Sequence, residues 1–225
     1  MIGKNKLADI KVFAAKHKPN FMGIIEVDLR RNENNVNENS TNALSTIQVY
    51  EKLKIDGYKL ILPASWEKHN KARIVVYADE EMNVSMKSPG GNESHLQNIL
   101  LEIGFGRAKK HLVSFYYREW KSCVTGNASQ ADQYRDLELL INIRRRSLSK
   151  DQDFLALGDM NLCAFKWDDP GYAHKDTADM VKDFMLEENC YQLVNKYTGL
   201  RLVNGVMQGS CIDHLTVNCV ENFQS

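Results

Sequence analysis

The sequence predicts a single α/β domain in which sheets are stacked as a sandwich and covered by helices. Apolar runs of strand length alternate along the chain with segments of helical periodicity, and no internal repeat is present. The chain has 225 residues, of which 43% are hydrophobic, enough for one sizeable core. Residues 1–225 are therefore expected to form one domain.

The helices are predicted where apolar residues recur every three or four positions, at about 7–18, 43–53, 130–147 and 177–188. The strands are predicted from short apolar or alternating runs, at 21–26, 58–62, 73–77, 83–86, 98–103, 112–117, 153–157 and 209–218. The segment 31–42 contains six asparagines and almost no apolar residue, so it is predicted to be a loop.

Charge and cysteine content limit the classes of function. The 29 basic residues balance the 29 acidic ones, and this neutrality does not by itself indicate nucleic-acid binding. The five cysteines are an odd number without a C-x-x-C pair, which favours reduced thiols in an intracellular protein over a structural zinc site. No apolar run is long enough to span a membrane, and no secretory signal opens the chain.

The segment 155–164 is the strongest indication of chemistry. An apolar run from Phe154 to Leu157 ends at Gly158, and Asp159 and Asn161 follow with one residue between them. In extended backbone both side chains would leave the same face of the sheet. The carboxylate could hold a metal or accept a proton from water, and the amide could orient that water. The spacing alone leaves a second interpretation equally open, in which both side chains cap a turn.

Three further strands end in, or carry, polar residues of the same kind. The apolar run from 21 ends at Glu26, the strand from 112 ends in Tyr117-Arg118, and the strand near the C-terminus carries Asp213. Each has an ordinary alternative: Glu26 could be the first solvent-exposed residue after a strand, and Tyr117 could be an interior strand aromatic. Their order along the chain, together with Asp159 and Asn161, is what favours a metal–phosphate site.

This order of motifs resembles the endonuclease/exonuclease/phosphatase superfamily, over about residues 6–218. Three details resemble in particular the apurinic-like endonuclease domains of non-LTR (LINE-type) retrotransposons: Tyr-Arg after the central strand, the S-x-I-D-H string from Ser210, and the stretch from Gly57 to Pro63. The resemblance implies a four-layer α/β sandwich, with two mainly antiparallel sheets packed face to face and helices outside. The family continues Tyr-Arg into prolines, whereas this chain has Glu119-Trp120, so the loop that follows is expected to differ.

The resemblance also implies roles for individual residues. Glu26 would be the ligand of Mg²⁺ (or Mn²⁺), Asp159, Asn161, Asp213 and Tyr117 would be catalytic, and Arg118 would bind substrate. The implied substrate is DNA, cut by phosphodiester hydrolysis. The resemblance further allows a nuclear location and a reverse transcriptase domain in a longer parent polypeptide. A membrane partner is not expected.

The two ends of the sequence depart from the family. The family ends with Ser-Asp-His, but we assign Ile212-Asp213-His214 to the preceding motif, in which Asp213 faces the site and His214 faces away. The family also opens with a strand that ends in an active-site Asn, and Asn5 follows no such strand. We therefore expect the first and last strands to be missing. Three hypotheses follow: a Mg²⁺-dependent DNA endonuclease, a non-catalytic domesticated or degenerate remnant, and a phosphatase or lipid phosphodiesterase of the same superfamily.

Overall fold

The structure is a computed structural model that describes residues 4–31, 43–44, 46–63, 66, 71–87, 96–104, 110–118, 137–138, 141–142, 145 and 152–219. The helices are α1 (Lys4–His17), α2 (Thr46–Leu53), the short 3₁₀ helix η2 (Ala164–Lys166) and α5 (Lys175–Glu187). The strands are β1 (Phe21–Arg31), β2 (Ala43–Leu44), β3 (Tyr58–Ile61), β4 (Lys71–Asp79), β5 (Asn83–Lys87), β6 (Leu96–Gly104), β7 (Lys110–Arg118), β8 (Asp153–Asp159), β9 (Tyr191–Gln192), β10 (Gly199–Val203), β11 (Val206–Ser210) and β12 (Asp213–Val217).

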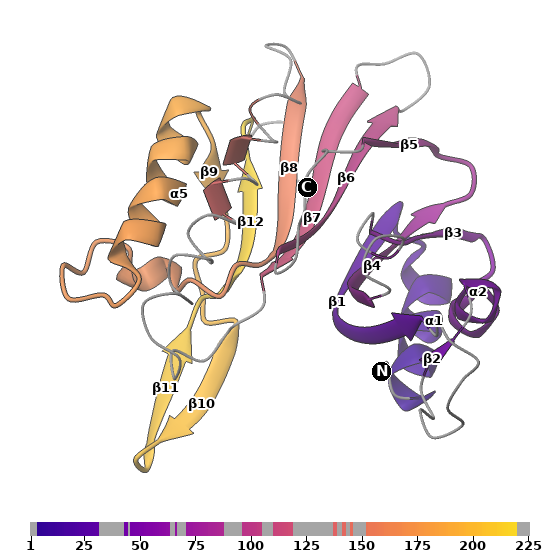
Figure 1. Cartoon of the computed structure of the whole chain (residues 1–225), viewed down its shortest axis with the longest axis horizontal. Coiled ribbons are helices and arrows are strands. Elements are labelled where there is room, and N and C mark those ends of the chain that lie inside the picture. The colour runs from indigo at the N-terminus through magenta and orange to yellow at the C-terminus, as the bar shows by residue number, and fades with distance from the viewer. Residues whose placement is uncertain are drawn as a thin grey trace.

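Two sheets face each other, and helices cover their outer faces (Figure 1). The four-stranded sheet has the order β2-β1-β4-β3, and the six-stranded sheet has the order β5-β6-β7-β8-β12-β9. Pairing is antiparallel except between β1 and β2 and between β7 and β8. This is the four-layer, mainly antiparallel sandwich that the sequence predicted.

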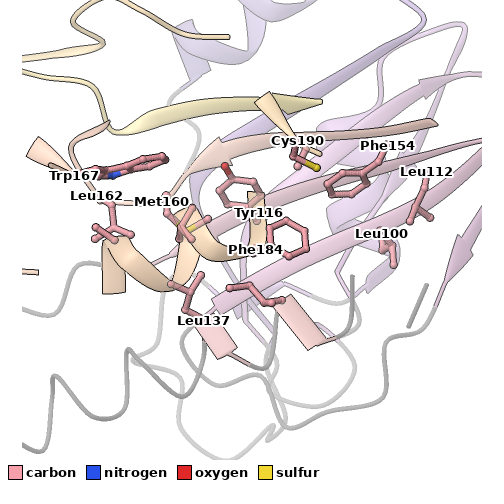
Figure 2. Packing of buried hydrophobic residues seen from close by; sticks show 14 residues of the cluster. Leu100, Leu112, Tyr116, Leu137, Phe154, Met160, Leu162, Trp167, Phe184 and Cys190 are labelled. Carbon is pink, nitrogen blue, oxygen red and sulfur yellow. The ribbon is translucent and has the colours of Figure 1, made fainter. Parts of the chain in front are cut away.

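Three apolar clusters separate the four layers. The first lies between α5 and the six-stranded sheet, where Phe184 packs with Phe154 and Tyr116 (Figure 2). The second joins α1 and α2 to the four-stranded sheet through residues such as Ala14, Val49 and Val75. The third fills the space between the sheets. Because strand residues alternate between faces, each central strand contributes to two of these clusters.

A bulge interrupts β1 midway. Ile25 pairs with Ile74 and Leu29 with Ala72, so residues 26–28 of β1 lie opposite the single residue Arg73 of β4. Glu26 has φ of 59° in this bulge, in the left-handed region that non-glycine residues rarely occupy. The bulge shifts the alternation of the strand by one position: Met22 and Ile24 before it, and Val27 and Leu29 after it, all pack in the cluster beneath α1 and α2. Glu26 is thereby released from the core and is exposed.

A hairpin of β10 and β11 projects from the sandwich just before β12 (Figure 1). Its turn is Asn204-Gly205, and both residues have positive φ, as a two-residue hairpin turn requires. Leu202 and Met207 are register partners and are 67% and 60% exposed. The hairpin leads through Cys211 and Ile212 into Asp213, so it lies next to the strand that carries this carboxylate.

Most described elements match the sequence-based expectations. The predicted strand at 21–26 continues to Arg31 through the bulge, and the predicted helix at 43–53 begins only at Thr46, after the short strand β2. The predicted strand at 209–218 is divided between the end of β11 and β12, and the β10–β11 hairpin was not predicted. Apart from Arg31, which ends β1, the predicted loop at 31–42 lies outside the described residues, as does most of the predicted helix at 130–147. Leu137 and Ile141, which are described within the latter, are buried against the six-stranded sheet. Within the described residues, no helix is long and apolar enough to cross a membrane.

Candidate active site at one end of the sandwich

A row of polar residues crosses the six-stranded sheet where β7 and β8 end and β12 begins. Tyr117 of β7 pairs in register with Asp159 of β8, and Asp159 pairs with Asp213 of β12. Directly paired residues project from the same face of a sheet. Tyr117 belongs to the cluster between the sheets, so the row faces the four-stranded sheet. The strand register thus brings together three residues that lie far apart in the sequence.

Glu26 approaches this row from the opposite sheet. β1 packs against β7 and β8, and the negative charge of Glu26 helps to raise the pKa of both Asp159 and Tyr117. The bulge is what allows this approach, because without it position 26 would continue the series Met22 and Ile24 into the cluster beneath the helices. A strained backbone at a polar, exposed residue is typical of functional sites.

The surroundings of Asp159 and Tyr117 shift the pKa values of both side chains. Burial raises the pKa of the Asp159 carboxyl from 3.8 to about 7, and repulsion from Asp213 and Glu26 adds to this effect. The hydrogen bond from the Asn161 main chain and the charge of Arg118 act in the opposite direction. Burial likewise raises the pKa of the Tyr117 hydroxyl, while Arg73 lowers it. A carboxyl with a pKa near neutrality in a polar row is suited to accepting and releasing protons.

The metal-ligand role expected of Glu26 stays a prediction. Asp159 and Asp213 are adjacent and Glu26 acts electrostatically on Asp159, but within the described residues no three His, Cys, Asp or Glu side chains are arranged as a metal-binding group. The donor chemistry still suits Mg²⁺, because all three side chains offer hard oxygen ligands and their mutual repulsion would be relieved by a cation. A divalent ion that keeps several of its waters needs few protein ligands.

The sequence suggested that strand alternation would place Asn161 on the same face as Asp159. The structure does not show this arrangement. β8 ends at Asp159, and Asn161 has φ of 51°, so the backbone between them is not extended. The main-chain N–H of Asn161 donates to Asp159 Oδ1 at 2.7 Å, and its side-chain Nδ2 donates to the carbonyl of Arg118 at 2.6 Å. The turn-capping interpretation is therefore realised in the structure. It also fixes the orientation of both side chains relative to the end of β7.

The position of Arg118 does not fit the substrate-binding role that the sequence suggested. Its side chain is 2% exposed, and Nη1 donates to the carbonyl of Met160 at 2.8 Å. Arg118 follows Tyr117 on β7 and so projects to the opposite face, toward the helix-covered layer. Its contacts instead stabilise the turn that carries Asp159 and Asn161. Sequence alternation could have indicated this, since Tyr117 and Arg118 cannot both face the site.

His214 lies on the opposite face of β12 from Asp213. It pairs in register with Gly158, its ring is 4% exposed, and Nε2 is 2.8 Å from the carbonyl of Leu162. The ring packs edge-on against Trp167, with centroids 5.2 Å apart. This is the alternation expected from the sequence. His214 thus belongs to the buried layer beneath α5.

Arg73 is a site residue that the motif analysis did not identify. Its Nη2 donates to the hydroxyl of Tyr117 at 3.4 Å, and its Nη1 lies 3.8 Å from Asp28 Oδ1. In the sequence, Arg73 opens the strand predicted at 73–77, whereas β4 begins at Lys71, so Arg73 lies within the strand. A charge in such a position requires a partner.

No protein-family model and no curated protein sequence matches this chain. Solved structures do match it. The endonuclease domain of TRAS1, a telomere-specific non-LTR retrotransposon, is 16% identical, with 95% of this chain and 79% of that chain covered and a TM-score of 0.60. TDP2 from D. rerio, complexed with a single-strand DNA product, is 9% identical, with 100% and 81% covered and a TM-score of 0.62. An AP endonuclease from Archaeoglobus fulgidus is 16% identical, with 96% and 82% covered and a TM-score of 0.56.

These similarities define the class of fold. The chain has the α/β sandwich of the endonuclease/exonuclease/phosphatase superfamily, as the motif order predicted. At these levels of identity the comparison concerns the fold alone, and the roles of individual residues depend on the geometry described above.

Proposed function

We propose that this protein is a metal-dependent endonuclease of retrotransposon-derived type that hydrolyses phosphodiester bonds in DNA. The observation that supports it most is the row of Tyr117, Asp159 and Asp213 opposite Glu26, in which the pKa of Asp159 is raised to about 7. This row combines a base with a pKa near neutrality, a hydroxyl donor and a group of hard oxygen ligands.

Each residue has a distinct task in this proposal. Asp159 accepts the proton of the attacking water, and its carboxylate is held by the hydrogen bond from the Asn161 main chain. Asn161 orients that water through its side-chain amide, whose position is fixed by its hydrogen bond to the Arg118 carbonyl. The Tyr117 hydroxyl donates a hydrogen bond to a phosphate oxygen. Burial is the main cause of the raised pKa of Asp159, and the negative charge of Asp213 adds to it.

Glu26 is the residue proposed to hold the Mg²⁺ or Mn²⁺ ion, with Asp159 and Asp213 nearby. When bound, the ion would supply positive charge to the phosphate and to the leaving 3′ oxygen. The fit depends on the oxygen-only donor set and on the repulsion among the carboxylates, which a cation offsets. Arg118, which the sequence suggested as a substrate ligand, is proposed instead to support the Asp159–Asn161 turn, because it is buried.

DNA is favoured as the substrate by two features. The sequence motifs resemble retrotransposon endonucleases, and the projecting β10–β11 hairpin leads directly into the strand that carries Asp213 (Figure 1). Projecting strands with exposed apolar residues such as Leu202 and Met207 are suited to contacting a nucleic-acid groove. The formal net charge of zero favours the alternative of a non-catalytic remnant, since it provides no general attraction for DNA.

The test is nicking of supercoiled plasmid DNA with MgCl₂, with MnCl₂ and with excess EDTA. The wild-type protein should convert supercoiled DNA to the open-circular form only with the divalent ion, and Glu26→Gln should abolish the reaction. The matched control is Glu187→Gln, because Glu187 lies on the surface of α5 and pairs with Arg145. Nicking by Glu26→Gln at the wild-type rate would refute the assignment, and absence of nicking by a folded wild-type protein would favour the remnant.

A further inference from the structure

Arg73 connects the two sheets beside the proposed active site. It lies on β4 directly opposite the three bulged residues 26–28 of β1, and its side chain is 23% exposed. Nothing in the proposed chemistry uses it. Yet it lies opposite the bulge in β1, and its side chain contacts both Tyr117 of β7 and Asp28 of the bulge.

Three contacts of Arg73 join the four-stranded sheet to the six-stranded sheet, and a fourth lies within the four-stranded sheet. Its Nη2 donates to the Tyr117 hydroxyl at 3.4 Å, and its guanidinium carbon lies 5.4 Å from the centre of the Tyr117 ring. Its main-chain N–H donates to Gln97 Oε1 at 2.5 Å, and Gln97 is the register partner of Tyr117. In the other direction, its Nη1 lies 3.8 Å from Asp28, which belongs to the bulge that presents Glu26.

These contacts have two physical consequences for Tyr117. The guanidinium occupies the phenol oxygen as an acceptor, so the phenol proton is directed elsewhere and becomes the better donor. The guanidinium over the ring, together with the hydrogen bond, restrains the orientation of the side chain. The ion pair with Asp28 couples this restraint to the Glu26 bulge, so that the two halves of the site are held in a fixed relation.

We propose that Arg73 is a positioning residue that holds the Tyr117 hydroxyl as a hydrogen-bond donor to the scissile phosphate and ties it to the Glu26 bulge. This inference rests on the proposed phosphodiester hydrolysis, because it names what keeps one of its donors in place. Arg73 acts through Tyr117, so its contribution to the reaction disappears when the hydroxyl is absent.

The decisive experiment is a double-mutant cycle of plasmid nicking with Arg73→Met, Tyr117→Phe and the double variant. Arg73→Met should lower kcat roughly 10–100-fold, the range typical of supporting residues around a catalytic group. KM should change little, since substrate binding is not the role of Arg73. The double variant should be no slower than Tyr117→Phe alone. If instead the two losses multiply, Arg73 acts independently of Tyr117 and the proposal is overturned.

Two further variants separate positioning from general stability. Arg73→Lys keeps the charge but loses the planar fork, and it should recover only part of the loss. It also keeps the cycle interpretable if Arg73→Met fails to fold. Arg145→Met removes another arginine that pairs with acidic residues, Glu187 and Glu188, on the surface of α5. It should leave kcat unchanged, and a loss equal to that of Arg73→Met would overturn the proposal.

A readout that does not require activity distinguishes this proposal from the proposed function. In protein labelled with ¹³C-tyrosine, the Cζ signal of Tyr117 is identified by its loss in Tyr117→Phe. Arg73→Met should shift this signal, and Arg145→Met should not. A shift in a protein that does not nick DNA would support the contact while the hydrolytic function fails. An unchanged Cζ signal in folded Arg73→Met would overturn the positioning role whatever the activity.

Discussion

Asp159 of β8 and Asp213 of β12 are register partners on adjacent strands, so their carboxylates project side by side from the same face of the sheet. Burial of Asp159 disfavours its ionised form, and the neighbouring charge of Asp213 adds to the cost of ionising it. The pair therefore makes the stability of the fold depend on pH in a direction opposite to that of most acidic residues.

The first prediction concerns this pH dependence. The folded-state pKa of Asp159, about 7, lies above its ordinary value of 3.8. The folded state therefore binds the proton more tightly, so the stabilisation is complete below about pH 4 and is lost as pH rises through about 7. Asp159→Asn removes this dependence, and its melting temperature should exceed that of the wild type at pH 8 but not at pH 4. The corresponding difference in the free energy of unfolding at pH 8 should be at most about a few kcal/mol. If the melting temperatures of the two proteins changed with pH by the same amount between pH 4 and pH 8, the raised pKa of Asp159 would be contradicted.

The second prediction concerns Asp213 and His214. Asp213→Asn should reduce nicking, because the charge beside Asp159 is lost, and it should raise the melting temperature at pH 8, because it removes the repulsion between the two carboxylates. His214→Ala should leave the rate per folded molecule nearly unchanged, but removal of its contact with Trp167 and Leu162 should destabilise the fold by roughly 1–3 kcal/mol. The measurements are nicking rates and urea unfolding of both variants. A stable but inactive His214→Ala would reverse the assignment.

The third prediction separates the two tasks of Asn161. Asn161→Ala loses the hydrogen bond to the Arg118 carbonyl and places a Cβ-bearing residue without a polar side chain at φ of 51°. It should cost roughly 1–3 kcal/mol of stability and abolish nicking. Asn161→Gly tolerates the positive φ, so it should be more stable than the alanine variant yet equally inactive. Nicking by the glycine variant at the parent rate would limit Asn161 to a structural role.

Some features of the site depend on local strand alternation and could be predicted from the sequence. Others depend on contacts between distant segments and could not. The orientation of His214 relative to Asp213 followed from strand alternation, which is a local property. The pairing of Asp159 with Asp213 was not predicted, because it depends on the order of the strands in the sheet. The facing of Arg118 away from the site also follows from alternation with Tyr117, but its burial depends on the Met160 carbonyl, which lies far along the chain. The Glu26 bulge could not be inferred, because its register is set by β4 rather than by β1 itself. The hairpin turn at Asn204-Gly205 was not predicted, although Asn-Gly is the strongest short signal for such a turn.

The fourth prediction concerns Gly158, which ends the apolar run before Asp159. Its φ is 152°, and a Cβ there would lie 1.8 Å from the Tyr116 carbonyl oxygen, a main-chain atom that cannot move aside. Gly158→Ala should therefore prevent folding or destabilise the protein by more than about 3 kcal/mol. Gly205→Ala is the matched control, because Gly205 also has positive φ but no atom within 4 Å of its added Cβ. It should cost only about 1–2 kcal/mol. Similar unfolding midpoints for the two variants would contradict the steric explanation.

The bulge in β1 also affects how the protein behaves toward other copies of itself. Asp79 N–H donates to the Asn20 carbonyl at 2.9 Å, so in the register of β1 and β4 the main-chain groups of Phe21, Gly23 and Ile25 point away from β4. In the described part of the chain, β1 meets a strand on that side only at Arg30 and Arg31. Such a row of main-chain donors and acceptors is a template for association between sheet edges. The bulge ends the regular row at Glu26 and sets an exposed negative charge there, so the distortion that aims a carboxylate at the site also shortens the edge on which aggregation could begin.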